Sequence, residues 1–317
     1  MTAKFRHSVQ AFLVLIVSLN NCGLSQAQTA FRWNLEQGEE FEVTLFQTTN
    51  SKTRVESRET VLNSSNTIVM NWTVAEVVDG VYKLEQELRQ IQLQVGDPAV
   101  PNQAVEYDTG LAEQKVSKVS RKLRKQILPL IGLKFNVSMT DLGEITDVEL
   151  PDETAEVINQ LPGTLAIRKL FSETGLRQVL GSASIVLPSE ELQPGEKWES
   201  RQELNLAFGD FVRIREFEYK GERKIDDNRF AEFKLTSRIE NKDADAGKDA
   251  GSGGVKKSIP SGTLKSFQGS GKMMLGLDSG YFVSSSVETQ VDTESPYREK
   301  TILTELISRV EISIKKL

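Results

Sequence analysis

The side chains with the most obvious chemical potential form a basic run. Residues 111–128 read LAEQKVSKVSRKLRKQIL, and their cations follow one another without an intervening acid: Lys115, Lys118, Arg121, Lys122, Arg124 and Lys125. Apolar residues recur between them at helical spacing, which predicts an amphipathic helix. A basic face of this kind favours contact with an anionic membrane surface or an acidic envelope protein. The alternative is the solvated face of a helix that covers a sheet.

Histidine and cysteine, the usual sources of bases, nucleophiles and zinc ligands, occur once each, as His7 and Cys22. Both lie in a segment with the order of a secretory signal: the cations Lys4 and Arg6, an apolar stretch from 11 to 19, and the small-residue stretch SQA at 25–27. The apolar stretch is too short to span a bilayer as a helix. We expect cleavage after Ala27 and a secreted or periplasmic protein.

The mature chain would then contain neither histidine nor cysteine. Lipid attachment at Cys22 is disfavoured, because Asn20 and Asn21 stand where such processing requires small residues. Thiol nucleophiles, Ser-His-Asp triads, disulfides and zinc sites built on His or Cys are excluded. We therefore expect a protein that is not an enzyme and that has no cofactor.

Acidic side chains remain as a source of catalytic or metal-binding groups. A carboxylate-dependent hydrolase is the minor alternative, and no acidic pair, Asp226–Asp227 included, stands out for it. Asp243 and Asp245 open a stretch that resembles a calcium loop, but Gly247 stands where an oxygen ligand is needed, so no metal site is predicted.

Loss of the two cations in the signal changes the formal charge from 39 − 45 = −6 to 37 − 45 = −8. This acidic balance argues against nucleic-acid binding.

Period-two alternation of apolar residues dominates the rest of the chain and predicts long strands, as in residues 41–45 and 68–74. Short turns between these strands favour antiparallel pairing with one buried face. Within residues 82–95 the apolar residues change parity, which predicts a β-bulge near Arg89.

Residues 152–180 predict two helices that are divided at Pro162-Gly163, the second around Leu165 to Leu180 with an interruption at Gly175. Together the elements predict a β-rich α+β fold. Its long antiparallel strands would form one or two curved sheets, like a half-barrel, with a few helices packed on one face.

Three phrases occur twice in the same order. LEQGEEF (35–41) matches LQPGEKW (192–198), VDGVYKL (78–84) matches IDDNRFAEFKL (225–235), and FNVSMTDLGEITDV (135–148) matches KMMLGLDSGYFVSSSV (272–287). They predict an internal duplication, with recurrent hairpin turns as the alternative.

The expected parts are a signal (1–27), a first β-rich half (28–150) with the basic helix, a helical connection (151–186), and a second β-rich half (187–317) with a flexible insert (242–262).

The stretches FRWNLEQGEEF, LPSEELQPGEKW and GLDSGYFVSSS resemble a family of secreted bacterial proteins that is classified only as a domain of unknown function. The resemblance covers about residues 31–317, and its motifs are turn and core residues, with no catalytic residues to transfer. The chain departs from it at Phe41, where the second half has Trp198, and in its long Gly/Ala/Asp insert. A β-sheet with helices on one face is also similar to periplasmic lipoprotein carriers, which hold acyl chains in a half-barrel.

These observations lead us to expect binding of an apolar or amphipathic ligand, such as a lipid or lipoprotein. The alternative is a structural or protein-interaction module of the cell envelope. A dry cavity of several hundred Å³ would favour the ligand binder, whereas a filled core would exclude it. The residues expected to line the cavity are Trp72, Phe135, Met139 and Phe233.

Overall fold

The computed structural model describes residues 29–100, 104–111, 121, 124–125, 127–160, 171–206, 209–242, 262–297 and 299–317. In this part of the chain the strands are β1 (Glu40–Val55), β2 (Arg58–Val78), β3 (Val81–Gly96), β4 (Val105–Asp108), β5 (Lys134–Thr140), β6 (Ile145–Glu149), β7 (Lys197–Leu206), β8 (Gly209–Ile225), β9 (Asn228–Asn241), β10 (Thr263–Gly276), β11 (Phe282–Tyr297) and β12 (Lys300–Lys316). The helices are the short 3-10 helix η3 (Leu128–Leu130), α3 (Asp152–Gln160) and α5 (Glu173–Ala183).

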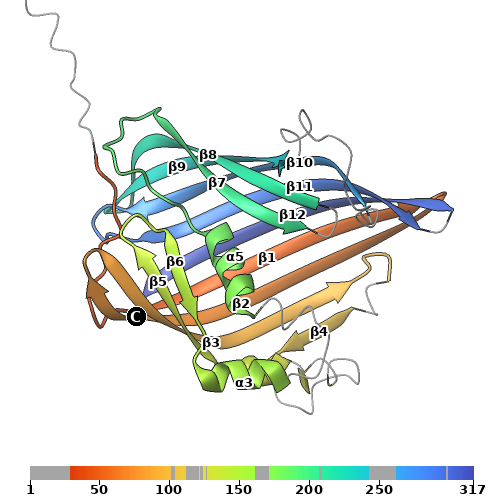
Figure 1. Ribbon diagram of the computed structural model, residues 1–317, viewed down its shortest axis with the longest axis horizontal. Helices are drawn as coiled ribbons and strands as arrows, with labels where there is room; N and C mark the ends of the chain where they lie inside the picture. Colours follow the sequence, from red (N-terminus) through yellow and green to blue (C-terminus); the bar gives the residue numbers. More distant parts are fainter. Residues whose placement is uncertain are drawn as a thin grey trace, which may run out of the picture.

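The strands form one curved antiparallel sheet in the order β6-β5-β3-β2-β1-β12-β11-β10-β9-β8-β7, with β4 paired to β3 (Figure 1). β1 and β12, from opposite ends of the chain, pair along nearly their whole length at the centre of the sheet. The path does not close, so β6 and β7 are its two edges. Helix α5 lies over the middle of the sheet (Figure 1), and we call the face that it covers the inner face.

The expected α+β class is wrong in its helical part, because the described chain is mostly β. The two α-helices whose bounds are described, α3 and α5, are short, and the strands form one sheet where one or two were expected. The sheet curves, so the apolar side chains on the inward faces of its long strands pack largely against one another. Little helix is therefore needed to cover them. α5 begins after its N-cap Ser172, whose hydroxyl accepts a hydrogen bond from the Gly175 N–H at 3.1 Å. Gly175 therefore lies in the first turn of the helix and does not interrupt it, contrary to the prediction.

The predicted bulge near Arg89 is confirmed. In the β2–β3 ladder Met70 pairs with Leu88 and Val69 with Gln90, so Arg89 has no opposite residue. One extra residue moves every later side chain of β3 to the other face. The inner face therefore receives even-numbered residues before the bulge and odd-numbered residues after it.

The two halves of the chain share a strand order and an initial turn, and the predicted internal duplication stays a prediction. The strand order β6-β5-β3-β2-β1 of the first half recurs as β11-β10-β9-β8-β7 in the second, with β12 between them. In each half the first strand follows the same turn: the Gly38 N–H donates to the Val74 carbonyl at 2.8 Å, and the Gly195 N–H donates to the Tyr219 carbonyl at 2.7 Å. The glutamate after each glycine accepts the return hydrogen bond from the same strand residue. Both glycines have positive φ, 88° and 95°, which side chains rarely adopt.

Candidate functional site

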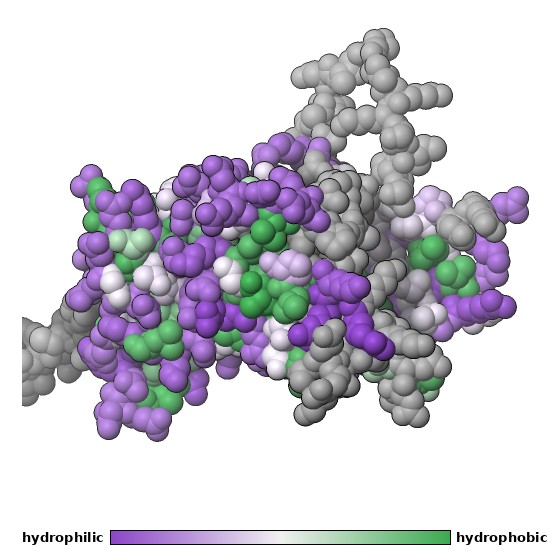
Figure 2. Space-filling model, turned by 90° about the horizontal axis from the view of Figure 1, so that it is seen from below, coloured by the Kyte–Doolittle hydropathy of each residue, from purple (hydrophilic) through white to green (hydrophobic). Residues whose placement is uncertain are grey.

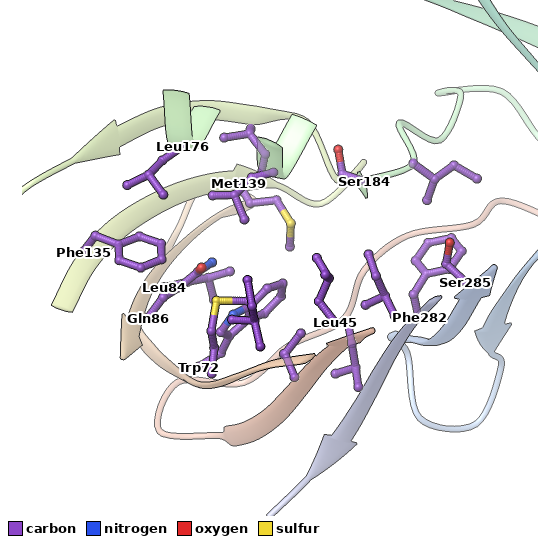
Figure 3. A pocket seen from close by; sticks show the side chains of 18 of the residues that line it. Leu45, Trp72, Leu84, Gln86, Phe135, Met139, Leu176, Ser184, Phe282 and Ser285 are labelled. Atoms are coloured by element: carbon purple, nitrogen blue, oxygen red, sulfur yellow. The ribbon is translucent and has the colours of Figure 1, made fainter. Parts of the chain in front are cut away.

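An apolar pocket lies between the inner face of the sheet and α5 (Figure 3). The cavity volume is about 150 Å³. All the empty space between the walls, including the open solvent at the mouth of the pocket, amounts to about 1250 Å³. The cavity itself is smaller than the several hundred Å³ that the sequence led us to expect. Its walls come from strands on both sides of the sheet centre and from the helix. On the face shown in Figure 2, hydrophilic residues predominate and hydrophobic residues form patches between them.

Strand register places the floor of the pocket. Val43 on β1 pairs with Met70 on β2, and Met70 pairs with Leu88 on β3, so these three side chains form one row on the inner face. In the next row Leu45 pairs with Ile68. Because paired residues of an antiparallel sheet point to the same side, the rows form a continuous apolar surface.

The opposite wall is α5 and the segment around it. Leu176 and Leu180 are four residues apart, so they lie on one side of the helix, and both line the pocket together with the preceding Phe171. Ser184, the C-cap residue, also lines it, and its carbonyl accepts a hydrogen bond from Arg215 Nη1 at 2.7 Å. This bond ties the end of the helix to β8, on the other half of the sheet.

Three polar atoms in this pocket are buried and have no hydrogen-bond partner among the described residues. They are Gln86 Oε1, Trp72 Nε1 and Trp33 Nε1. Gln86 is 1% exposed and pairs directly with Trp72 across the β2–β3 ladder. The indole of Trp33 lies against Gly143, where a Cβ would come within 2.7 Å of Nε1. Trp72 and Gln86 are thus neighbouring polar groups in a mostly apolar wall, which also includes Ser184 and Ser285 (Figure 3).

Of the four residues expected to bind a ligand, Trp72, Phe135 and Met139 line the pocket. Phe233 does not. It is 0% exposed and lies in an aromatic cluster, with ring centroids 5.3 Å from Phe31 and 5.7 Å from Trp198. Phe233 is therefore a core residue of the second half.

Sequence reasoning missed Gln86 and the two leucines of α5. Gln86 occupies an inward position in the alternation of β3, between Leu84 and Leu88. The alternation therefore predicts that its side chain faces inward. Nothing in the sequence shows which part of the sheet α5 covers, so the roles of Leu176 and Leu180 had no local signal.

A second polar group is buried on the inner face of β8. Arg215 is 4% exposed, donates to the Ser200 hydroxyl at 3.1 Å and lies over the ring of Phe217. Arg213, two residues away, donates to the side-chain oxygen of Gln202. Burial, together with the charge of Arg213, lowers the pKa of Arg215 to about 10. Arg215 is thus a buried cation at the end of α5 that donates to the Ser184 carbonyl and to the Ser200 hydroxyl.

The expected basic surface lies mostly outside the described residues, which do not include Lys115, Lys118 or Lys122. Arg121 and Lys125 are exposed and helical, and Arg124 donates to the Leu111 carbonyl at 2.8 Å. The proposed contact with an anionic surface stays a prediction. Within the described chain, no helix is long and apolar enough to cross a membrane, and no group of three or more acidic, histidine or cysteine side chains could hold a metal ion.

No model of a known protein family matches the sequence, and no curated protein matches it either. The resemblance to a family of secreted bacterial proteins is therefore not confirmed and stays a prediction.

Several solved structures are similar to this chain at low levels. A lipovitellin structure, described for its lipid–protein interactions, is 9% identical with a TM-score of 0.46, over 89% of this chain and 25% of that one. This chain thus spans about a quarter of the length of lipovitellin. An outer membrane channel from Pseudomonas putida F1 is 9% identical with a TM-score of 0.24, over 89% and 97% of the two chains. A Bacteroides fragilis protein with a YmcC-like fold is 9% identical with a TM-score of 0.21, over 88% and 99%. At these values none of the likenesses bears on function.

Proposed function

We propose that this protein is a non-catalytic binder of an apolar or amphipathic small molecule, such as a lipid, and that the pocket beneath α5 is its binding site. The observation that carries the proposal is an apolar pocket, partly open to solvent, in the middle of the inner face. Ligand sites are characteristically concave and mostly apolar, with a few placed polar groups. With the secretory signal predicted from the sequence, the ligand would be met outside the cytoplasm.

The size of the pocket limits how the ligand enters. A dry apolar cavity of about 150 Å³ holds a group of roughly the size of benzene. A longer acyl chain would place one end in the cavity and continue through the mouth, where the wider space is open to solvent. The helix wall rests on apolar packing, on the bond between Arg215 and Ser184, and on an exposed ion pair between Arg177 of α5 and Asp147 of β6 at 2.6 Å. It has far fewer hydrogen bonds to the sheet than the strands have to one another, so α5 can shift outward more easily than a strand.

The proposal is tested by binding of N-phenylnaphthylamine, an apolar fluorophore whose emission rises in apolar surroundings. Wild-type protein is expected to bind it, and Leu45→Trp to bind it at least about tenfold more weakly, because the larger side chain fills the cavity. Leu62→Trp is the matched control: Leu62 lies on β2, away from the pocket, and is 44% exposed. Equal binding by all three proteins, or no binding by wild type, contradicts the proposal.

Native mass spectrometry of the protein purified gently from its host provides a second test. A co-purifying lipid mass that is lost in Leu45→Trp supports binding at this pocket. A clean protein mass in the wild type counts against it.

A further inference from the structure

The two unpartnered polar atoms of Gln86 and Trp72 need an explanation that packing does not give. A buried polar group without a partner costs about 1–3 kcal/mol. An apolar side chain at either position would fill the same wall without that cost. Two other buried polar groups close by do have partners: Trp198 Nε1 donates to the Val186 carbonyl at 2.8 Å, and the Tyr82 hydroxyl donates to the Trp33 carbonyl at 2.6 Å. Trp33 Nε1, like Trp72 Nε1, is a donor without a described partner.

The two atoms are complementary in their chemistry. Gln86 Oε1 accepts hydrogen bonds and Trp72 Nε1 only donates them. The residues are direct partners across the β2–β3 ladder, so their Cβ atoms lie about 4.5–5.5 Å apart on the same face. One small group that both donates and accepts, placed between them, would satisfy both atoms. A hydroxyl does this with a single oxygen.

A charged group fits this place poorly. A carboxylate only accepts hydrogen bonds, so it could accept from the indole and, after rotation, from the Gln86 amide N–H, but it cannot donate to Gln86 Oε1. It would also lose its hydration in an apolar wall. Among the described residues, the side chains that line the pocket include no cation to compensate for that loss. Gln86 and Trp72 therefore discriminate between a neutral and an anionic head on the same apolar body.

We propose that the ligand of this pocket carries a neutral hydroxyl, which donates to Gln86 Oε1 and accepts from Trp72 Nε1. This inference rests on the proposed function and names the class of ligand: a fatty alcohol or another slender hydroxylated apolar molecule. Both protein atoms are buried, so the hydroxyl reaches them after a rotation of the Gln86 side chain, a change that is common on binding.

The test compares octanol, octane and octanoate as competitors of N-phenylnaphthylamine. A purely apolar pocket binds octane more tightly than octanol, because burial of an unpaired hydroxyl is unfavourable. Wild-type protein is expected to reverse this order, with octanol at least as tight as octane and at least about tenfold tighter than octanoate. Gln86→Met keeps the length of the side chain and is expected to restore the preference for octane. The ratio of the octanol affinity to the octane affinity should fall about tenfold.

Two further variants serve as comparisons. Trp72→Phe removes the indole donor and keeps an aromatic ring, so it is expected to shift the ratio in the same direction by a smaller factor. Gln92→Met is the matched control, because Gln92 is an exposed glutamine of β3 that bonds Asp108 outside the pocket. It is expected to leave the ratio unchanged.

The outcomes separate the two proposals. If wild type binds octane more tightly than octanol, and Gln86→Met has the same ratio, the pocket binds apolar molecules and the hydroxyl inference is overturned. If wild type binds none of the compounds nor the fluorophore, the proposed function fails, and the inference that rests on it falls too. Gln86→Met is expected to melt at a higher temperature than wild type, since it removes the unpaired amide, and this shows that weaker octanol binding is not a folding defect.

Discussion

The two halves of the sheet share a strand order and an initial turn, yet their inner faces differ. Corresponding residues can be counted from Val74 and Tyr219, which make the same hydrogen bonds to the two turns. By strand register Trp72 corresponds to Phe217, Met70 to Arg215, Ile68 to Arg213, Gln86 to Leu235 and Phe135 to Gly271. The positions that form the pocket in the first half thus hold different side chains in the second.

In the second half, aromatic rings pack over the corresponding positions. Trp198 stacks on Phe217, with centroids 5.2 Å apart, and meets Phe233 edge-on at 5.7 Å. Its indole N–H is bonded to the Val186 carbonyl. In the first half, Trp72 lines a cavity and its indole N–H has no described partner. The comparison teaches that one backbone arrangement supports a packed core or a pocket, and that the side chains on the inner face decide which.

The largest expected effect comes from truncating one phenylalanine in each half. Phe233→Ala is expected to lower the free energy of unfolding by about 3–5 kcal/mol, because its ring is packed on all sides. Phe135→Ala is expected to cost at least about 1 kcal/mol less, since one side of its ring faces the cavity and has fewer contacts to lose. Urea denaturation of both variants measures the difference. Equal losses would show that the first half is packed as tightly as the second.

A smaller effect is expected from the two tryptophans. Trp198→Phe and Trp72→Phe remove the same atoms, but only the first breaks a described hydrogen bond and leaves the Val186 carbonyl unpaired. Trp198→Phe should therefore be the more destabilising by about 1–2 kcal/mol. The comparison requires the two unfolding curves under the same conditions. A greater loss for Trp72→Phe would mean that its indole already has a partner in solution.

The smallest difference is expected at the two turns. Gly38→Ala and Gly195→Ala each force a side chain into positive φ, at about 1–2 kcal/mol. An added Cβ meets nothing within 4 Å at either site. The two losses should therefore agree within about 0.5 kcal/mol, as judged from thermal or urea unfolding. A clear inequality would contradict the structural equivalence of the turns.

Features set by neighbouring residues could be predicted from the sequence. The bulge at Arg89 follows from a change of parity within one strand. The repeated phrases LEQGEEF and LQPGEKW mark two turns with the same hydrogen bonds, because glycine at the same place allows the same positive φ. Alternation also placed Trp72, Phe135 and Met139 on the inner face, where all three line the pocket.

Features set by distant contacts could not be predicted. Phe233 alternates inward just as Met139 does, but its ring lies among the aromatic rings of Phe31, Trp198, Tyr219 and Phe282, most of them distant in the sequence. The pairing of β1 with β12 joins residues at opposite ends of the chain, and no local pattern specifies it.

The sequence by itself determined the strands, their inward faces, the bulge and the two matching turns, because backbone sterics and side-chain alternation act over a few residues. Only the tertiary structure decided that the strands form one open sheet, that α5 covers its middle, and that Gln86 and Trp72 stand side by side in a partly filled space. The physical reason is that a cavity forms where side chains from segments far apart in the chain do not fill the space between them. It therefore exists only when the helix has packed against the sheet.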